Sequence, residues 1–193
     1  MGDVEAVVLA AGLSRRSKRY KMALPLGDRS VIERSIDGMY DSVSRIIVVV
    51  GWQAEVVRRL LAPYDKVECV FNKEFRKGMF SSVRAGVACV SAQRFFLQPG
   101  DIPLVREDVY AQLLQSEGDV IIPTYERHKG HPVLIDSCLV PEILSAPANV
   151  TLRDVLVHHK GILIEVDDQA ILWDLDTEDD YQHLLQRERC RHG

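Results

Sequence analysis

Two almost unbroken apolar runs, at residues 4–10 and 45–50, constrain the fold more than any other feature of this sequence. A strand with one solvated face alternates apolar and polar residues, whereas a strand covered on both faces of a parallel sheet is apolar throughout. Shorter apolar segments follow at 66–71 and 94–98, and helical stretches separate the segments. This alternation predicts β-α-β units, and therefore an α/β fold with a mostly parallel sheet and right-handed crossovers.

Capping residues predict several helix boundaries. Ser30 and Glu33 form a capping box that opens a helix. Ser81 or Ser82 is expected to cap another helix, and Thr177 the last one. Beyond residue 103 we expect a helix over 105–117, a strand over 119–123, a hairpin over 125–135 that turns at Lys129 and Gly130, a short helix over 151–158, and strands over 162–166 and 170–173.

Composition and charge exclude several kinds of function. With 193 residues, 47% apolar and 27% charged, the chain can bury a core as one domain without metals or disulfides. A net charge of −4 argues against a nucleic-acid partner. The first apolar run is too short for a signal peptide or a membrane span, so no membrane association is expected. Single cysteines without a zinc spacing predict reduced thiols in the cytoplasm: Cys69, Cys89, Cys138 and Cys190.

A basic loop follows the first apolar strand. The strand ends in the small-residue turn Leu9-Ala10-Ala11-Gly12, where main-chain amides can approach an anion. In an open α/β sheet, ligands bind at the carboxyl ends of the strands, where this loop lies. Neither the P-loop pattern nor GxGxxG is present, and a solvated basic loop is the alternative interpretation. The cations of the loop are Arg15, Arg16, Lys18, Arg19 and Lys21.

A candidate metal ligand, Asp101, follows the apolar strand at 94–98 and lies between Gly100 and Pro103. One oxygen of such a carboxylate can bind Mg²⁺ while phosphate oxygens and water fill the other positions. An ordinary turn is the alternative, because Gly, Asp and Pro mark turns in general.

An acidic segment at 173–180 contains a second candidate ligand. Asp179 and Asp180 suit the dipole at the start of a helix and need no other explanation. Asp174 and Asp176 precede this helix and project from one side of an extended segment, so one of them can reach a metal ion. We expect Asp176 to be that ligand, and Asp174 is the alternative.

Together these segments resemble motifs of nucleotidyltransferases similar to the molybdenum cofactor cytidylyltransferases and guanylyltransferases. The family signature LAAGxSxRMGxxK matches residues 9–21 except at Ser17 and Lys18, where the family has Met and Gly. GDIPLV resembles the GDxP motif, and DLDTEDDY resembles DxDTPEDY. NKEFRKGMFSSVRAG at 72–86 is similar to N…GMxxSLxxG, and RHKGHP at 127–132 to RxGHPV. The resemblance therefore extends over nearly the whole chain in the right order.

The resemblance implies a role for each matched residue. Catalytic roles fall to Lys21, Arg16 and Asp101. Mg²⁺ is the implied cofactor, held by Asp101 and Asp176. The implied nucleotide-binding residues are Leu9, Ala10, Ala11, Gly12, Ser14, Arg16, Lys21, Asn72, Gly78, Ser81, Ser82 and Gly100. The implied acceptor-binding residues are Arg127, Gly130, His131 and Pro132.

The resemblance also implies a three-layer sandwich with a Rossmann-like, GT-A-like nucleotidyltransferase fold. We expect a single domain over 1–193, with a nucleotide-binding half at 1–104 and an acceptor-binding half at 105–193.

The implied reaction transfers a nucleoside monophosphate from a nucleoside triphosphate to the terminal phosphate of molybdopterin cofactor and releases pyrophosphate. Ala11, where the guanylyl branch usually has AGG, favours CTP over GTP. A molybdenum hydroxylase is a further implied partner. Two alternatives remain open: transfer to a sugar phosphate or alcohol phosphate, and a non-catalytic nucleotide- or cofactor-binding maturation protein in which Ser17 and Lys18 mark decay.

The departure at Lys18 leads to a testable prediction. If the family glycine only lets the loop turn, Lys18 must adopt the same backbone at a cost of about 1 kcal/mol. We expect Lys18→Gly to strengthen CTP binding, because Arg16 and Lys21 already match the family's cations. Titration calorimetry at one salt concentration should therefore give a CTP Kd below that of the wild type. Weaker binding would mean that Lys18 itself contributes a cation to the phosphates.

Overall fold

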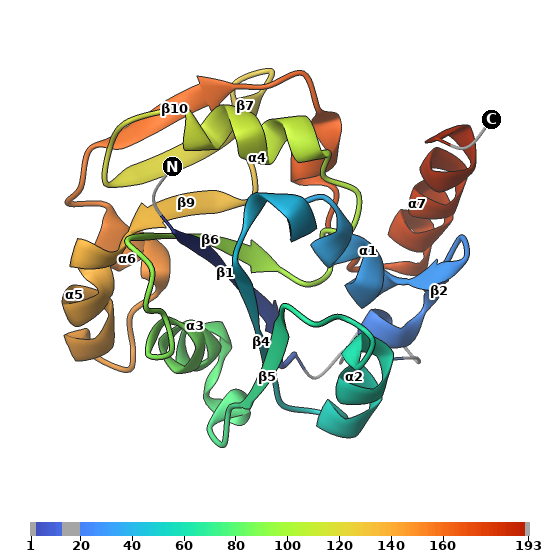
Figure 1. Cartoon of the computed structure of the whole chain (residues 1–193), viewed down its shortest axis with the longest axis horizontal. Helices are drawn as coiled ribbons and strands as arrows, with labels where there is room; N and C mark the ends of the chain where they lie inside the picture. Colours follow the sequence, from blue (N-terminus) through green and yellow to red (C-terminus); the bar gives the residue numbers. More distant parts are fainter. Residues whose placement is uncertain (1–2, 13–19, 192–193) are drawn as a thin grey trace.

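The computed structural model describes residues 3–12 and 20–191, and within them eight strands form one sheet (Figure 1). The short strand β8 (His128–Lys129) pairs with β7 at one side. The other seven lie in the order β10 (Gly161–Glu165), β7 (Val120–Tyr125), β9 (Val133–Asp136), β6 (Arg94–Pro99), β1 (Val4–Ala10), β4 (Arg45–Val50) and β5 (Val67–Phe71).

Most strand pairs of this sheet are parallel. β1 lies between β4 and β6 and runs parallel to both, and β5 extends the parallel arrangement beyond β4. β9 is antiparallel to its neighbours β6 and β7, while β10 is parallel to β7. The prediction of an α/β fold with a mostly parallel sheet is confirmed.

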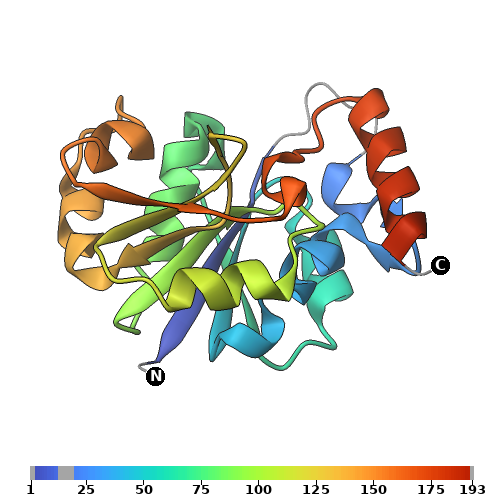
Figure 2. The same cartoon turned by 90° about the horizontal axis from the view of Figure 1, so that it is seen from above.

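Helices cover both faces of the sheet, which makes three layers (Figure 2). Side chains alternate along each strand, so β1 directs Ala6 and Val8 to one face and Val7 to the other. The first face packs against α1 (Val31–Asp37), α2 (Ala54–Leu61) and α4 (Glu107–Leu114). The second face packs against α3 (Met79–Val87), α5 (Val140–Ser145) and α6 (Leu152–Leu156). Burial on both faces explains why the first strands are apolar throughout.

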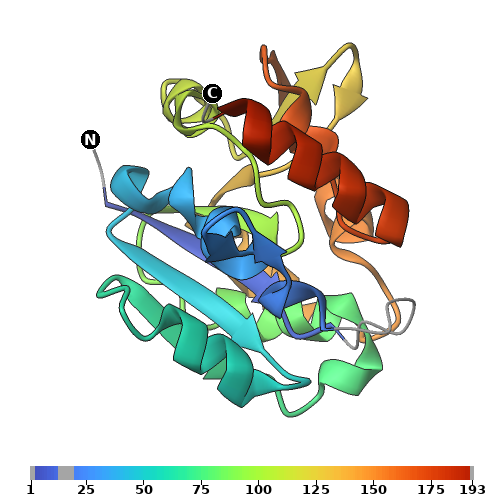
Figure 3. The same cartoon turned by 90° about the vertical axis from the view of Figure 1, so that its right-hand side faces the viewer.

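The last helix, α7 (Glu178–Arg191), lies beside a small hairpin formed by β2 (Pro25–Leu26) and β3 (Arg29–Ser30) (Figure 3). A separate apolar cluster joins them, and it includes Leu26, Leu104, Tyr181 and Leu184. The Tyr181 hydroxyl donates to the Pro25 carbonyl at 2.5 Å. No described helix is both long and apolar enough to cross a membrane.

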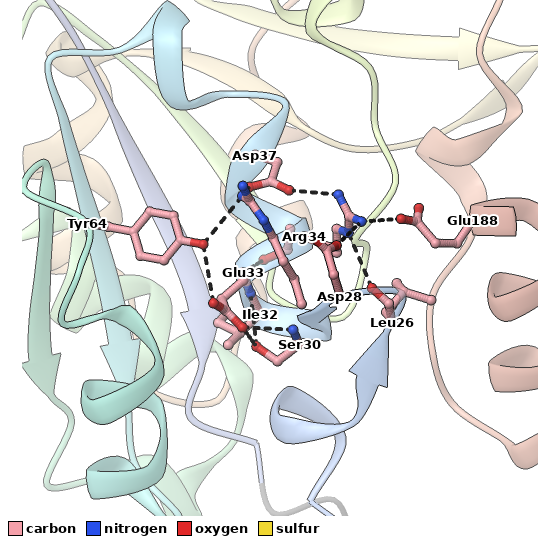
Figure 4. A network of polar contacts seen from close by, with 11 residues as sticks. Leu26, Asp28, Ser30, Ile32, Glu33, Arg34, Asp37, Tyr64 and Glu188 are labelled. Atoms are coloured by element: carbon pink, nitrogen blue, oxygen red, sulfur yellow. Dashed lines mark hydrogen bonds and ion pairs between the residues drawn. The ribbon is translucent and has the colours of Figure 1, made fainter. Parts of the chain in front are cut away.

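Arg34 of α1 anchors α7 and the hairpin to the body of the protein (Figure 4). Its guanidinium lies 2.7 Å from Asp28 in the hairpin and 3.3 Å from Asp37 in α1, and it also pairs with Glu188 of α7. Its Nε donates to the Leu26 carbonyl at 3.3 Å. Because the Arg34 guanidinium pairs with carboxylates of the hairpin, of α1 and of α7, it fixes the hairpin and α7 relative to α1.

Some boundaries differ from the sequence predictions because of local hydrogen bonds. The hairpin does not turn at Lys129 and Gly130; β7 and β8 are joined at Glu126 and Arg127, both with positive φ. Residues 170–173 do not form a strand. The carboxylate of Asp168 accepts a bond from the amide of Ala170 at 3.0 Å, which starts the 3-10 helix Gln169–Leu172.

Two further helix predictions need correction. Ser81 and Ser82 do not cap α3, which begins at Met79 after Gly78. Gly78 has a φ of 105°, a conformation that favours glycine, and the backbone turns sharply into the helix there. The helix expected over 105–117 is shorter, at Glu107–Leu114.

At the amino end of the sheet, the buried carboxylate of Glu5 connects three segments. It accepts bonds from the amide and hydroxyl of Ser91, from the amide of Ala92 and from Arg45. Burial raises the pKa of Glu5, but these hydrogen bonds outweigh burial and hold the pKa below its usual value. The ionised form therefore stabilises the fold.

We expect Glu5→Gln to lower the free energy of unfolding at neutral pH by about 1 to 3 kcal/mol, because an amide nitrogen would face hydrogen-bond donors. A depressed pKa contributes stability above the unfolded value of about 4.3, and this contribution is lost as pH falls through the folded pKa. The difference from wild type should therefore shrink below about pH 4. Urea unfolding of both proteins at a series of pH values measures this difference in the free energy of unfolding. Glu68→Gln, at the exposed partner of the same Arg45, is the control and should change stability little.

Candidate active site

The carboxyl ends of β1 and β6 bring the first two predicted motifs together. The strands are paired with Leu9 opposite Pro99, and the amide of Gly100 donates to the Leu9 carbonyl at 2.9 Å. A Cβ at Gly100 would lie 2.9 Å from Ile32 and 3.2 Å from the Leu9 carbonyl oxygen. A side chain at Gly100 would therefore crowd the end of β1, so glycine favours this close contact between β1 and the turn that carries Asp101.

Lys21 lies at the centre of the charged groups at this edge. It begins the 3-10 helix Lys21–Ala23, and its side chain is only 10% exposed. Its Nζ lies 2.6 Å from Oδ1 of Asp176 and 3.6 Å from Oδ2 of Asp101. Three residues that were proposed from separate motifs therefore share one cluster. Burial strengthens the attraction between these charges relative to bulk water.

Asp101 lies beside the segment that precedes α7. Its carbonyl accepts a hydrogen bond from the amide of Leu175 at 3.0 Å, which places Asp174 and Asp176 on either side of this contact. Burial raises the pKa of Asp101; Lys21 opposes this shift, and the negative charges of Asp174 and Asp176 add to it. Asp174 is thus within electrostatic range of the cluster although it makes no ion pair with Lys21 among the described contacts.

The donor set fits a divalent cation of the magnesium type. Asp101 and Asp176 offer hard carboxylate oxygens that already converge on one cation, the Lys21 ammonium. Within the described ranges, no group of three or more His, Cys, Asp or Glu side chains could hold a metal ion alone. Mg²⁺ is commonly bound by one or two carboxylates, with phosphate oxygens and water as the other ligands.

Asn72, Ser81 and Ser82 form a second cluster, at the end of β5. The side-chain nitrogen Nδ2 of Asn72 donates to Ser81 at 2.9 Å and to Ser82 at 3.1 Å, and its side-chain oxygen Oδ1 accepts from the amide of Glu74 at 2.8 Å. The main-chain amide of Asn72 donates to Val50 of the neighbouring strand at 2.9 Å. The cluster holds the loop over 72–78 against the start of α3. Asn72 and Ser81 also line a pocket of about 310 Å³.

The predicted acceptor residues lie in two places. Gly130 donates to the Pro123 carbonyl at 2.9 Å, and the amide of His131 donates to Ile171 at 3.0 Å. Burial lowers the pKa of His131, while the main chain of Leu97 and the charge of Asp174 oppose the shift. The buried Pro132 follows His131 directly. Arg127, in contrast, is exposed at the β7–β8 turn and has no described contact with the Lys21 cluster.

Ser14 and Arg16 fall outside the described residues, as do Ser17 and Lys18. Asp174, the alternative metal ligand, acts electrostatically on Asp101 and on His131: its charge contributes to raising the pKa of Asp101 and opposes the lowering of the pKa of His131. Gln98 was not singled out at all. A polar residue that ends an apolar strand just before Asp101 was the available signal.

Comparison with known proteins finds relatives over nearly the whole chain. The Escherichia coli (strain K12) molybdenum cofactor cytidylyltransferase is 28% identical over 182 residues, which cover 94% of this chain and 95% of that protein. Nicotine blue oxidoreductase from Paenarthrobacter nicotinovorans is also 28% identical, over 96% of this chain and 100% of that protein.

Among solved structures, Rv0371c from Mycobacterium tuberculosis H37Rv is 27% identical with a TM-score of 0.82, covering 95% of this chain and 98% of that one. The structure of the Rv0371C complex with manganese, also from Mycobacterium tuberculosis H37Rv, is 25% identical with a TM-score of 0.79, and the match covers 96% of this chain and 98% of that one.

The family described as MobA-like NTP transferase domain matches residues 6–162. The matched region contains Lys21 and Asp101, and it ends before Asp176. The match spans most of the chain, and a full-length relative is a cytidylyltransferase. The chain belongs to the MobA-like NTP transferase family and is a nucleotidyltransferase.

Proposed function

We propose that this protein transfers CMP from CTP to the terminal phosphate of molybdopterin cofactor, with Mg²⁺ as cofactor. The observation that carries the proposal is the meeting of Lys21, Asp101 and Asp176 at the carboxyl end of the sheet. The full-length similarity to a molybdenum cofactor cytidylyltransferase supports the choice of nucleotide and acceptor. Ala11, in place of the first glycine of the AGG that the guanylyl branch usually has, also favours CTP.

The reaction requires two negatively charged groups, the acceptor phosphate and the triphosphate of CTP, to approach each other. A phosphate oxygen of the acceptor attacks the α-phosphorus of CTP, the bond to the bridging oxygen breaks, and pyrophosphate leaves with the electron pair. Lys21 would hold triphosphate oxygens and stabilise the charge that develops on the leaving group. Mg²⁺ bound by Asp101 and Asp176 would neutralise further phosphate charge. A covalent nucleophile is not required, because this kind of transfer depends on positioning and electrostatics.

The remaining roles are assigned with the same proposal. The turn at Leu9–Gly12 with Ser14 and Arg16, and the Asn72 cluster with Gly78 and Gly100, would bind the nucleotide. The loop at 130–132, close to Asp174, would face the acceptor, and Arg127 would reach it from the β7–β8 turn. We assign residues 1–104 to the binding of the nucleotide and residues 105–193 to the binding of the acceptor.

The proposed location is the cytoplasm. The four free cysteines are consistent with a reducing compartment and support this proposal. There, a molybdenum hydroxylase would receive the product.

An acceptor panel tests this function against its alternatives. Pyrophosphate release is measured with CTP or GTP, Mg²⁺ or Mn²⁺, and molybdopterin cofactor, sugar phosphates or alcohol phosphates. We expect release with CTP and molybdopterin cofactor. Release only with another phosphate would reassign the acceptor. Tight CTP binding without any release would favour the non-catalytic alternative.

Asp101→Asn should abolish turnover and leave the fold intact, because asparagine keeps the size of the side chain and Lys21 keeps its ion pair with Asp176. Circular dichroism and thermal unfolding check the fold, and pyrophosphate release checks the activity. Asp167→Asn, which removes an exposed carboxylate from the loop before Gln169–Leu172, is the control and should retain activity. Full pyrophosphate release by Asp101→Asn in Mg²⁺ would refute the metal assignment.

Lys21→Ala should weaken CTP binding and slow the reaction, because it removes a buried cation from the phosphates. The expected loss is about 1 to 3 kcal/mol, as for a charged hydrogen bond. Titration calorimetry gives the CTP affinity, and Lys66→Ala is the control because Lys66 is also partly buried but donates to the Tyr40 carbonyl. Unchanged affinity together with a normal rate would refute the assignment of Lys21 to the phosphates of CTP.

A further inference from the structure

Gln98 is a fully buried amide at the end of β6, just before the turn that carries Asp101. Its Nε2 donates to the carbonyl of Ser35 at 3.0 Å and to the carbonyl of Ile102 at 2.9 Å. Its Oε1 accepts from the hydroxyl of Tyr110. A nitrogen that faces two carbonyls and an oxygen that faces a hydroxyl allow only one orientation of the amide. The side chain of Gln98 is therefore held in place.

These contacts connect the turn to two helices. The carbonyl of Ser35 lies in the last turn of α1, where the amide of Met39 donates to Ile36 instead. Gln98 thus satisfies a carbonyl of the kind that a helix end leaves without a partner. Tyr110 comes from α4, is fully buried, and packs edge-to-face on Phe96 with ring centroids 5.1 Å apart.

The main chain around Asp101 is held by several bonds. The amide of Gly100 donates to Leu9, the amide of Ile102 donates to Pro99, and the carbonyl of Asp101 accepts from Leu175. The bond from Gln98 to the Ile102 carbonyl adds a tie across the turn from inside the core. The main chain that carries the Asp101 side chain is consequently held from β1, from β6 and from the segment before α7.

The hydroxyl of Tyr110 keeps its proton. Burial raises the pKa of this hydroxyl, and its hydrogen bond to Gln98 only partly opposes the shift. Tyr110 therefore remains a donor throughout the neutral pH range. Burying an amide without partners costs free energy, and Gln98 avoids this cost because both ends of its amide are paired.

We propose that Gln98 and Tyr110 are positioning residues that hold the Asp101 carboxylate in place to bind a divalent cation. This inference rests on the proposed function, in which Asp101 is a metal ligand.

Tyr110→Phe tests it, because this change removes the hydroxyl and keeps the ring that packs on Phe96. Electron paramagnetic resonance of free Mn²⁺ gives the Mn²⁺ affinity of the protein, with and without α,β-methylene-CTP. We expect Mn²⁺ binding to weaken roughly three- to tenfold, the effect of losing one neutral hydrogen bond. The Mn²⁺ concentration needed for half-maximal pyrophosphate release should rise by the same factor, while the rate at saturating Mn²⁺ changes less.

Val109→Ala is the matched control. Val109 precedes Tyr110 in α4 and is 1% exposed, so its truncation perturbs the same helix without touching the polar contacts. Gln98→Met, which keeps the length of the side chain and removes its donors, should weaken Mn²⁺ binding more than Tyr110→Phe. If Gln98→Met does not fold, the comparison of Tyr110→Phe with Val109→Ala decides the question.

The outcomes separate this inference from the proposed function. If Tyr110→Phe weakens Mn²⁺ binding no more than Val109→Ala does, while Asp101→Asn abolishes it, Gln98 and Tyr110 have only a structural role and the inference is refuted. If wild type and Asp101→Asn bind Mn²⁺ equally, or neither binds it, the metal assignment itself fails and the inference fails with it.

Discussion

The ammonium of Lys21, shared between the carboxylates of Asp101 and Asp176, is the interaction on which the candidate site depends. Lys21 and Asp176 are 155 positions apart in the sequence, and Asp101 comes from a third segment. Two carboxylates in a partly buried place repel each other, and a cation between them offsets that repulsion. The same charges suit a triphosphate and its metal ion, so the cluster both holds three segments together and prepares the site for its proposed substrate.

The framework around this cluster limits how far its members can move. Lys21 precedes the β2–β3 hairpin and Asp176 precedes α7. The bond from Tyr181 to Pro25 joins these two elements, and so does Arg34, which contacts Asp28 and Glu188 (Figure 4). On the other side, Gln98 and the close contact of Gly100 with Leu9 hold the turn of Asp101. The rigid parallel half of the sheet thus supports loops that carry the chemistry.

Similarity of fold alone does not determine the reaction in this group of proteins. One relative, matched over 95% of its length, is a cytidylyltransferase, and another of equal identity, matched over its whole length, is an oxidoreductase. The assignment to nucleotidyl transfer follows from the family match and is consistent with the charged groups at the sheet edge. The function of such a chain has to be argued from its site, because related sheets can support different chemistry.

The sequence by itself determined that the sheet is mostly parallel and that its first two motifs follow strands of that sheet. Apolar strands at β1 and β4 require cover on both faces, and parallel strands place the loops of Ala11 and Asp101 at one edge. Only the tertiary structure decided the rest. The sequence predicted a strand at 170–173, but the carboxylate of Asp168 accepts from the amide of Ala170 and starts the 3-10 helix Gln169–Leu172 there. The hairpin turns at Glu126 and Arg127, which have positive φ, and not at the predicted Lys129 and Gly130. The contacts of Lys21 with Asp176 and of Gln98 with Ser35 join distant segments, and local patterns of residues carry no information about such contacts.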